Sequence, residues 1–400
     1  MISVDEALDI VLSRIEHIGT ERVRLDQARG RVLAENVCAD IDLPPFDRAR
    51  MDGYAMRSED ASVAPIRLRA VGEIAAGARM TERLESGEAV KIFTGAPIPA
   101  GADAVQKVEV TESDGETVLI KEAVRPGQFI TPRASEVAAG ETVARRGREI
   151  GPAEMAVLAS FGYAEVQVAR KPRAAVLSTG SELVEVSTKP VEAQIRNSNS
   201  YTISAYAERA GAAVTNLGTV KDSFTDTRNA LVEASRSRDL VITSGGVSMG
   251  DYDLVKAALE DLGAEIFFDR VSIRPGKPTV FARLDSTFFF GLPGNPVSTS
   301  VTFNVFARPA LRKMQGDDDP LLPTVRAALA RPIKDASGRR SYLPARLFIE
   351  DGRAGAEPLK WVGSSDLVAF MRANALIVVP EETHDISEGE MVEVFALTRF

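Results

Sequence analysis

Histidine and cysteine are almost absent from this chain. Its 400 residues include one cysteine, Cys38, and two histidines, His17 and His384. A disulfide framework is therefore excluded, and so is a structural zinc site, which needs about four cysteine or histidine ligands. A serine or cysteine nucleophile activated by histidine is also disfavoured. Any metal ion is expected to be a hard cation on carboxylates, and Mg²⁺ is the first choice.

Long apolar runs and an excess of positive charge are missing as well. No run approaches the roughly 18 apolar residues that a membrane-spanning helix requires. The N-terminal MISVDEALDIVL carries an early acidic pair, whereas a signal peptide begins with basic residues. The 48 Lys and Arg residues against 57 Asp and Glu give a net charge of −9. We therefore expect a cytoplasmic protein with neither a nucleic-acid nor a membrane partner.

The length of the chain predicts two to four domains, at about 100–200 residues per domain. Residues 3–18 are expected to form an amphipathic packing helix, with capping-box spacing between Ser3 and Glu6. Short alternating runs separated by Gly, Pro and Asp turns indicate a β-rich subdomain between about 40 and 150. Residues 151–169 return to a helix, followed by a short strand.

Strand and helix patterns alternate from residue 173 to about 312, which predicts a mainly parallel sheet with helices on both faces. A polar linker at 316–324 precedes short strands typical of a small β-barrel or sandwich. The expected fold class is multidomain α/β plus β, with a doubly wound sheet, a β-rich inserted subdomain and a C-terminal β-barrel or sandwich. The predicted domains are an N-terminal helical and linker part (1–40 plus 141–172), the β-rich subdomain (41–140), the α/β domain (173–315) and the C-terminal β domain (316–400).

Three glycine-containing loops follow predicted strands, at the carboxyl ends where such sheets bind ligands. They are STGSEL (178–183), TSGGVSMGDYD (243–253) and GLPGNPVS (291–298). Glycine allows a ligand to approach the backbone closely, and main-chain N–H groups near a helix start bind phosphate without a basic side chain. None of the loops fits GxxxxGK[ST] or GxGxxG, so an ordinary P-loop and a dinucleotide fingerprint are both absent.

Two charged features near these loops have two interpretations each. Asp251 and Asp253 either cap and stabilise the next helix or hold a magnesium ion that bridges carboxylate and phosphate. Capping is the simpler interpretation of either aspartate alone, whereas three loops at one sheet edge favour the metal. RPGKP (274–278) is either a solvated turn or, beside a phosphate cradle, an oxyanion clamp.

Together these stretches resemble the molybdopterin molybdenumtransferase family, which includes the bacterial MoeA-type enzymes and the E domain of gephyrin. Nine stretches match in family order across nearly the whole chain: PPFDRARMDGYA, EIAAG, FTGAPIPAGADAV, STGSEL, NSNSY, VITSGGVSMGDYD, RPGKP, GLPGNPVS and RANALIVVP. Each is weak alone, but nine in order are specific.

The resemblance implies a molybdopterin-binding α/β domain and a homodimer whose active site is shared with the partner's β-rich subdomain. The reaction it implies takes adenylylated molybdopterin and molybdate as substrates, inserts molybdenum into the dithiolene, and releases AMP with the help of Mg²⁺. The implied partners are this pterin nucleotide, the enzyme that adenylylates molybdopterin, and the downstream molybdoenzymes.

The resemblance also implies roles for individual residues. The implied catalytic residues are Asp52, Glu136, Glu182 and Asp253, and the last three of these are also implied magnesium ligands. The positions associated with molybdate are Arg274, Lys277, Arg339 and Ser364. The positions that bind the pterin nucleotide are Thr94, Ser178, Thr179, Gly180, Asp222, Ser244, Gly245, Gly246, Ser248, Gly250, Gly291, Pro293, Gly294 and Asn295.

Several positions depart from the family pattern and leave a second hypothesis open. Glu136 stands in place of a catalytic-type aspartate, Asn197 in place of an aspartate, and Arg274 in place of a lysine. Residues 131–135 have also lost an arginine and a glutamate, and the C-terminal GSG is GSSD at 363–366. The alternative function is a catalytically altered paralogue that binds or carries molybdopterin or the molybdenum cofactor without turnover. The two hypotheses differ in whether AMP is released.

Overall fold

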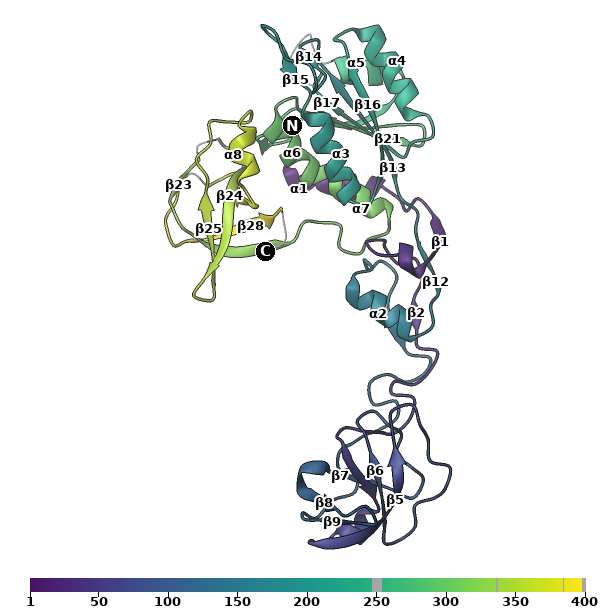
Figure 1. Ribbon diagram of the computed structural model, residues 1–400. Coiled ribbons are helices and arrows are strands. Elements are labelled where there is room, and N and C mark those ends of the chain that lie inside the picture. The colour runs from purple at the N-terminus through teal and green to yellow at the C-terminus, as the bar shows by residue number, and fades with distance from the viewer. Residues whose placement is uncertain (247–253, 336, 384, 398–400) are drawn as a thin grey trace. The chain divides into compact units, whose positions relative to one another are not determined.

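The computed structural model describes residues 1–246, 254–335, 337–383 and 385–397 (Figure 1). The chain folds into two compact units. The first consists of Met1–Ala34, Gly147–Ile150 and Gln167–Phe400, and the second of Glu35–Arg146 and Gly151–Val166. The chain thus leaves the first unit and returns to it twice before the α/β region begins. No helix in the described ranges is long and apolar enough to cross a bilayer.

The first unit contains the doubly wound sheet that the strand and helix pattern predicts. In spatial order its strands are β16 (Ala213–Val220), β13 (Arg173–Thr179), β17 (Leu240–Ser244), β21 (Thr287–Leu292), β20 (Val280–Leu284) and β18 (Glu265–Phe268). The first four strands are mutually parallel, and β20 runs antiparallel to both of its neighbours. The expected mainly parallel sheet is therefore confirmed.

Helices cover both faces of this sheet because successive side chains along each strand point to opposite faces. Ala174 and Val176 of β13 pack into one core, with α1 (Val4–Arg14), α3 (Asn199–Arg209), α6 (Pro296–Thr302) and α7 (Arg308–Met314). Ala175, between them, packs into a second core with α4 (Phe224–Ser235) and α5 (Leu254–Asp261). A π-helical segment, η4 (Phe303–Ala307), separates α6 from α7 in one continuous run of helical residues.

The N-terminal helix confirms its predicted start. The Ser3 hydroxyl accepts a hydrogen bond from the Glu6 N–H, and the Glu6 carboxylate accepts one from the Ser3 N–H, which completes the capping box. Val4, Ala7 and Val11 are buried in the core. The helix ends at Arg14, earlier than expected, because Ile15 adopts an extended backbone conformation.

The C-terminal strands close into a barrel, which decides between the two expected architectures. Strands β24, β25, β22, β28 and β26 follow one another, and β26 also pairs with β24. Their bounds are β22 Thr324–Leu329, β24 Arg340–Glu350, β25 Arg353–Pro358, β26 Ala375–Val379 and β28 Met391–Ala396. The two-residue strand β19 (Ile273–Arg274) pairs with β24 in parallel, so the RPGKP segment is attached directly to the barrel. The short elements beside the barrel are β23 Ile333–Lys334, α8 Leu367–Met371 and β27 Asp385–Ile386.

The second unit is β-rich, as expected. Its sheet has the spatial order β7 (Ala104–Lys107), β4 (Gly53–Met56), β6 (Glu88–Ile92), β5 (Ile66–Ile74), β9 (Thr117–Ile120) and β8 (Thr111–Ser113). Helix α2 (Pro152–Ser160) begins with Pro152 in its first turn, as predicted. The remaining strands of the chain are short: β1 Thr20–Arg24, β2 Val37–Cys38, β3 Arg48–Ala49, β10 Ile130–Thr131, β11 Thr142–Ala144, β12 Glu165–Ala169, β14 Leu183–Val184 and β15 Ile195–Arg196. The four predicted domain boundaries remain a prediction.

Candidate active site

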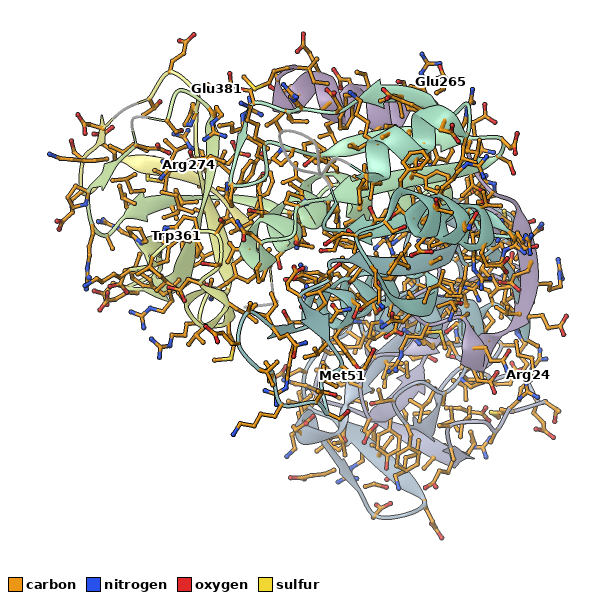
Figure 2. All side chains as sticks on the ribbon, turned by 90° about the horizontal axis from the view of Figure 1, so that it is seen from above. Arg24, Met51, Glu265, Arg274, Trp361 and Glu381 are labelled. Carbon is orange, nitrogen blue, oxygen red and sulfur yellow. The ribbon has the colours of Figure 1, made fainter. Side chains whose placement is uncertain are left out.

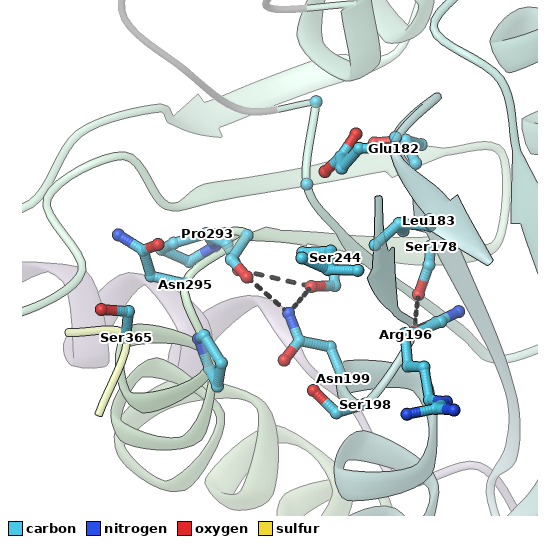
Figure 3. A pocket seen from close by; sticks show the side chains of 18 of the residues that line it. Ser178, Glu182, Leu183, Arg196, Ser198, Asn199, Ser244, Pro293, Asn295 and Ser365 are labelled. Carbon is cyan, nitrogen blue, oxygen red and sulfur yellow. Dashed lines mark hydrogen bonds between the residues drawn. The ribbon is translucent and has the colours of Figure 1, made fainter. Parts of the chain in front are cut away.

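A cavity of about 660 Å³ lies at the carboxyl ends of β13, β17 and β21 (Figure 3). All three predicted glycine-containing loops line it, because parallel strands bring their carboxyl ends to one edge of the sheet. Of the predicted residues, it is lined by Ser178, Thr179, Gly180, Glu182, Asp222, Ser244, Gly245, Gly246, Pro293, Gly294 and Asn295. Gly291 is buried within β21 and does not line the cavity. Residues Ser248, Gly250, Asp251 and Asp253 lie outside the described residues.

Glycine is required where the loops after β13 and β17 meet. Gly245 has a φ of 86°, and a Cβ atom there would collide with the carbonyl oxygen of Thr179. A Cβ atom on Gly246, with a φ of 65°, would lie 2.7 Å from the hydroxyl oxygen of Thr179. Both glycines thus combine a left-handed backbone with a close approach that no side chain permits. Backbone rather than side chain therefore lines the cavity at these two glycines, and this part of the lining is called the backbone floor below.

Asparagine side chains fix the loops relative to one another. Asn199, in the first turn of α3, donates from Nδ2 to Ser244 Oγ and to Gly294 O, at 2.7 Å each (Figure 3). Ser178 Oγ donates to Asn197 Oδ1 at 3.1 Å, and Asn197 Nδ2 donates to Thr219 Oγ1 at 3.0 Å. These bonds hold the ends of neighbouring strands in one arrangement without occupying the cavity.

One buried hydroxyl at the cavity is left for a ligand. Thr179 is 4% exposed, and its Oγ1 atom has no hydrogen-bond partner within the part of the chain that the structure describes. A buried polar group without a partner is unfavourable by about 1–3 kcal/mol, so a ligand oxygen that reached it would relieve this cost. Together with the backbone floor, this favours a ligand rich in hydrogen-bonding oxygen atoms.

Two carboxylates and one guanidinium line the cavity. Glu182 is exposed, and Asp222 accepts a hydrogen bond from the Ser181 N–H at 2.9 Å. Arg196 donates from Nε to Thr188 O at 3.0 Å, and it lines the cavity beside them. The carboxylates are hard oxygen donors, and Mg²⁺ is usually held by one or two carboxylates together with substrate phosphates. The donor chemistry therefore fits magnesium, although no three acidic, histidine or cysteine side chains of the described residues converge on a metal position.

A second cavity, of about 460 Å³, adjoins the first and contains every residue that the resemblance associates with molybdate. Arg274, Lys277, Arg339 and Ser364 all line it, although the RPGKP segment, Arg339 and Ser364 are far apart in the chain. Pro278 lines both cavities. The other lining residues are Pro275, Gly276, Ser298, Trp361, Val362 and Gly363. Figure 2 labels Arg274, which lies on β19 next to the barrel strand β24, and Trp361, which lies between β25 and α8.

The second cavity is electropositive. Its lining includes three cations, and one of them, Arg274, donates from Nη1 to the carboxylate of Asp335 at 2.5 Å. Lys277 forms no side-chain hydrogen bond or ion pair with any described residue, so its ammonium is available to a ligand. Arg339 Nη1 donates to Ile273 O at 3.2 Å, which leaves its other donors free. Such a site favours a small anion with several acceptor oxygens.

The hydroxyl of Ser364 is oriented for the same kind of ligand. Asn295 Nδ2 donates to Ser364 Oγ at 2.9 Å. Because that bond uses an acceptor lone pair of the hydroxyl, the serine proton is free to be donated elsewhere. Asn295 itself lines the first cavity, so this hydrogen bond connects the two cavities.

Three of the predicted residues lie in the second unit. Asp52 accepts from the N–H and from the hydroxyl of Thr94, at 2.7 Å each, and these bonds, the hydroxyl first, lower the pKa of Asp52. Glu136 accepts from Arg48 Nη2 at 2.9 Å in an exposed ion pair. The structure thus joins Asp52 to Thr94 and gives Glu136 a cationic partner, Arg48, that the sequence did not reveal.

Sequence reasoning missed several residues that line these cavities. In the first they are Leu183, Ile195, Arg196, Asn197, Ser198, Asn199, Pro278, Pro296 and Ser365, and in the second Trp361 is the largest. A usable signal existed in NSNSY, since asparagine and serine at the start of a helix after a strand mark the ligand-binding edge of the sheet. No comparable signal existed for Arg196, which lies in the two-residue strand β15, or for Trp361, which lies between β25 and α8.

Comparison with known families accounts for nearly the whole chain. Residues 2–162 match the MoeA N-terminal region (domain I and II), 175–313 match a probable molybdopterin binding domain, and 326–397 match the MoeA C-terminal region (domain IV). The two cavities lie within and between the last two matched regions. This agrees with the order in which the nine sequence stretches resemble the family.

Individual relatives match at full length. The molybdopterin molybdenumtransferase of Haemophilus influenzae is 36% identical over 398 residues, which cover 98% of each chain. That of Bacillus subtilis is 35% identical, over 99% of this chain and 94% of the relative. The crystal structure of the molybdopterin biosynthesis moeA protein from Pyrococcus horikoshii OT3 superimposes with a TM-score of 0.86 at 32% identity, over 99% of this chain and 100% of that one. The chain therefore belongs to the molybdopterin molybdenumtransferase family.

Proposed function

We propose that this chain is a transferase of molybdenum cofactor biosynthesis that inserts molybdenum from molybdate into adenylylated molybdopterin and releases AMP. The observation that carries the proposal is the pair of adjoining cavities, joined by Pro278 and by the hydrogen bond from Asn295 to Ser364. One cavity has a backbone floor suited to a phosphorylated ligand, and the other has cations suited to an oxyanion. Two substrates bound side by side react faster because the step between them becomes effectively unimolecular.

The first cavity would hold the pterin nucleotide. Its volume of about 660 Å³ lies in the range typical of small-molecule sites. The unpartnered Thr179 hydroxyl would bind a phosphoanhydride oxygen. The N–H groups of Gly180 and Gly245 already donate to Val220 O and Leu292 O, so these two are not counted among the ligand's donors. Arg196 would add a positive charge at the same edge. No side-chain nucleophile is needed, which agrees with the shortage of histidine.

Magnesium would be held by carboxylates at the rim of this cavity. When bound, it supplies the positive charge that polarises the phosphoanhydride and stabilises the leaving phosphate of AMP. Glu182 and Asp222 are the described carboxylates that line the cavity. The resemblance adds Asp253, outside the described residues, and Glu136 of the second unit. These residues would bind and orient the metal together with the substrate phosphates.

Molybdate would occupy the second cavity. Arg274, Lys277 and Arg339 would neutralise the dianion, and the Ser364 hydroxyl would donate a hydrogen bond to one of its oxygens. Two of the cations come from RPGKP and the third from Arg339, so their charges stay close together only when the anion or the fold compensates their repulsion. A site of this kind selects small oxyanions by charge and size.

The assembly that completes the site is also part of the proposal. A homodimer in which Asp52, Thr94 and Glu136 reach the partner's pterin site would give each active site residues from two chains. The hydrogen bonds that already order the Asp52 carboxylate against Thr94 support a functional role for this pair. We also propose that the protein is cytoplasmic. It would receive adenylylated molybdopterin from the adenylylating enzyme and pass the finished cofactor to molybdoenzymes.

The alternative of a cofactor-binding paralogue without turnover is favoured by one contact. Glu136, the residue proposed to replace a catalytic-type aspartate, is paired with Arg48 at 2.9 Å. A carboxylate engaged by arginine is less available to a metal. Both side chains are well exposed, at 39% and 48%, so the pair contributes only about 0–1 kcal/mol and a metal would displace it readily.

The deciding experiment is AMP release from adenylylated molybdopterin by purified protein with Mg²⁺, in the presence and absence of molybdate. Release that depends on molybdate would establish the insertase. Tight binding without release would establish the alternative. The variant Lys277→Met should abolish the molybdate dependence, whereas Lys171→Met, which removes an exposed lysine outside both cavities, should leave it intact.

Molybdate binding has an independent readout. Trp361 is the one tryptophan of the chain and lines the second cavity, so tryptophan fluorescence reports on that cavity alone. We expect molybdate to change this fluorescence in a saturable way in the absence of pterin. The change should disappear in Lys277→Met and persist in Lys171→Met. If millimolar molybdate leaves the tryptophan fluorescence unchanged, the second cavity is not the molybdate site.

A further inference from the structure

A third cavity of about 650 Å³ lies in the first unit, and it shares no lining residue with the two cavities above. It is located at the C-terminal end of α3, the helix whose first residue, Asn199, lines the pterin-nucleotide cavity. Eleven helical residues span about 16 Å, so the two sites are well separated. The lining residues are Glu149, Tyr206, Arg209, Ala210, Asn304, Arg308, Arg312, Leu322, Pro323, Val325 and Ala396.

Three arginines face this cavity, and their charges are compensated unequally. Arg312, 5% exposed, pairs with Glu149 at 2.8 Å and with Asp317 at 2.5 Å. Arg308 donates from Nη1 to Pro320 O at 2.7 Å, and Arg209 donates from Nη2 to Leu397 O at 2.5 Å. Neither of these two has a carboxylate within ion-pair distance in the described ranges. Within the described residues, the cavity therefore contains two guanidinium charges without a direct counter-charge.

The environment of Arg308 disfavours its unpaired charge. Burial and then the neighbouring charges of Arg312 and Arg209 lower the pKa of Arg308. A guanidinium presents five N–H donors, and Arg308 uses one of them on Pro320. An anion placed between Arg308 and Arg209 would satisfy further donors and remove the repulsion. Arginine forks bind phosphate oxygens in pairs, which makes a phosphate group the best match.

The remaining walls provide a place for the organic part of such a ligand. The ring of Tyr206 stacks on Phe303 with centroids 5.3 Å apart, and Asn304 follows Phe303 in the π-helical segment η4. Single-turn π-helical segments occur often at functional sites, and this one places Asn304 and Arg308 at the cavity. The lining also has an apolar part, which consists of Leu322, Pro323, Val325 and Ala396.

We propose that this cavity is a second ligand site, distinct from the active site, which binds a small phosphate monoester. The phosphate lies between Arg308 and Arg209, and the organic part lies against Leu322 and Val325. The overall charge of −9 would repel anions, so a local cluster of unpaired arginines is the feature that permits binding. The ligand also contacts α7 and the first and last barrel strands, and its binding stabilises the first unit.

The test uses phenyl phosphate as the probe and phenol as the uncharged control, with full-length protein. Calorimetry should show one phenyl phosphate bound per chain at this site, with no binding of phenol. Because the active site also accepts phosphate, an arginine-selective reagent followed by peptide mapping should locate the binding. Phenyl phosphate is expected to protect Arg308 and Arg209 from modification, and phenol is not.

The variants separate a binding role from a structural one. Arg308→Met and Arg209→Met should each weaken the protection of the other arginine at least tenfold, and Arg308→Lys should restore part of it. Lys277→Met, in the proposed molybdate cavity, should leave the protection unchanged. Protection that survives both arginine variants, or no protection at millimolar phenyl phosphate, would overturn the proposal. These outcomes do not depend on AMP release, so the proposed function and this site can fail separately.

Discussion

Arg274 donates from Nη1 to Oδ1 of Asp335 at 2.5 Å, while Oδ2 of the same carboxylate is buried without a hydrogen-bond partner in the described residues. Asp335 is 4% exposed, whereas the Arg274 side chain is 42% exposed. The carboxylate is thus the fixed member of the pair and the guanidinium the accessible one. Asp335 therefore positions Arg274 at the proposed molybdate cavity without lining that cavity itself.

Replacing Asp335 should affect molybdate more than the pterin nucleotide. Asp335→Asn keeps the shape of the side chain but loses the charge that anchors Arg274. We therefore expect the affinity for molybdate to fall about tenfold and the free energy of unfolding to fall by about 1–3 kcal/mol. Titration of Trp361 fluorescence with molybdate measures the first effect and urea unfolding the second. Asp385→Asn, on an exposed edge of the same barrel region, is the control. Tighter molybdate binding would show that Asp335 opposes the anion.

Acid should destabilise the first unit through Asp239. This carboxylate accepts from Nη1 and Nη2 of Arg170, at 2.9 and 2.8 Å, and from the Arg173 N–H at 2.7 Å. Burial opposes its ionisation, yet the bonds from Arg170 and Arg173 lower its pKa below the ordinary value of 3.8. A pKa that is lower in the folded state stabilises the protein above the unfolded pKa, and this contribution disappears as pH falls through the folded value.

The variant Asp239→Asn tests this assignment. At neutral pH we expect it to lower the free energy of unfolding by about 2–3 kcal/mol, because Arg170 then loses its charged partner. The difference from the unsubstituted protein should begin to shrink as pH falls below the ordinary pKa of 3.8, and it should vanish only below the lower pKa of the folded state, where Asp239 is protonated. Urea unfolding at neutral pH and at about pH 3.5 measures this. A difference that is independent of pH would mean that the charge of Asp239 contributes nothing to stability.

The backbone floor of the pterin-nucleotide cavity can be tested with a matched pair of glycines. Gly245 and Gly218 both have left-handed backbones, with φ of 86° and 79°, but only at Gly245 would a Cβ atom collide with a neighbour. We expect Gly218→Ala to lower the stability by about 1–2 kcal/mol and to leave ligand binding intact. Gly245→Ala should cost more and should abolish AMP binding, measured by calorimetry. Equal effects would show that backbone strain alone matters.

Removal of magnesium and removal of one carboxylate ligand should both impair AMP release. Chelation is expected to stop AMP release, and Glu182→Gln should raise the magnesium concentration needed for half-maximal release at least tenfold. Glu185→Gln, an exposed glutamate three residues away that does not line the cavity, is the control. An unchanged magnesium requirement in Glu182→Gln would remove this residue from the metal site.

Local signals in the sequence predicted much of the first unit. The capping box at Ser3 and Glu6 marked the start of α1, and the alternation of strands and helices placed three glycine loops at one sheet edge. Closure of the barrel could not be predicted, because it depends on the pairing of β26 with β24 across the chain. Strand β25, with the sequence RAGAEP, was missed because Gly355 and Pro358 indicate a loop.

The site was predicted to different extents in its two cavities. The glycine loops followed from sheet geometry, and RPGKP, with Arg274 and Lys277, was a candidate oxyanion clamp from its own residues. The grouping of this segment with Arg339 and Ser364 followed only from the family resemblance, since no spacing relates these positions. Asp335 was not identified by either route. Its importance comes from burial next to Arg274, and burial in a segment between short strands has no local sequence signal.

The two-residue strand β19 has a consequence for how this protein can be divided. Ile273 and Arg274 pair with Arg340 and Ser341 of β24, and the Arg340 N–H donates to Ser272 O at 3.2 Å. Cutting the chain at the polar linker after α7 would leave these backbone groups without partners. The segment that carries Arg274 would then lose its pairing with β24, although this segment precedes the cut by some 40 residues. The sheet and the barrel therefore depend on each other for their structure. A chimaera of two relatives should fold only when both parts come from the same relative.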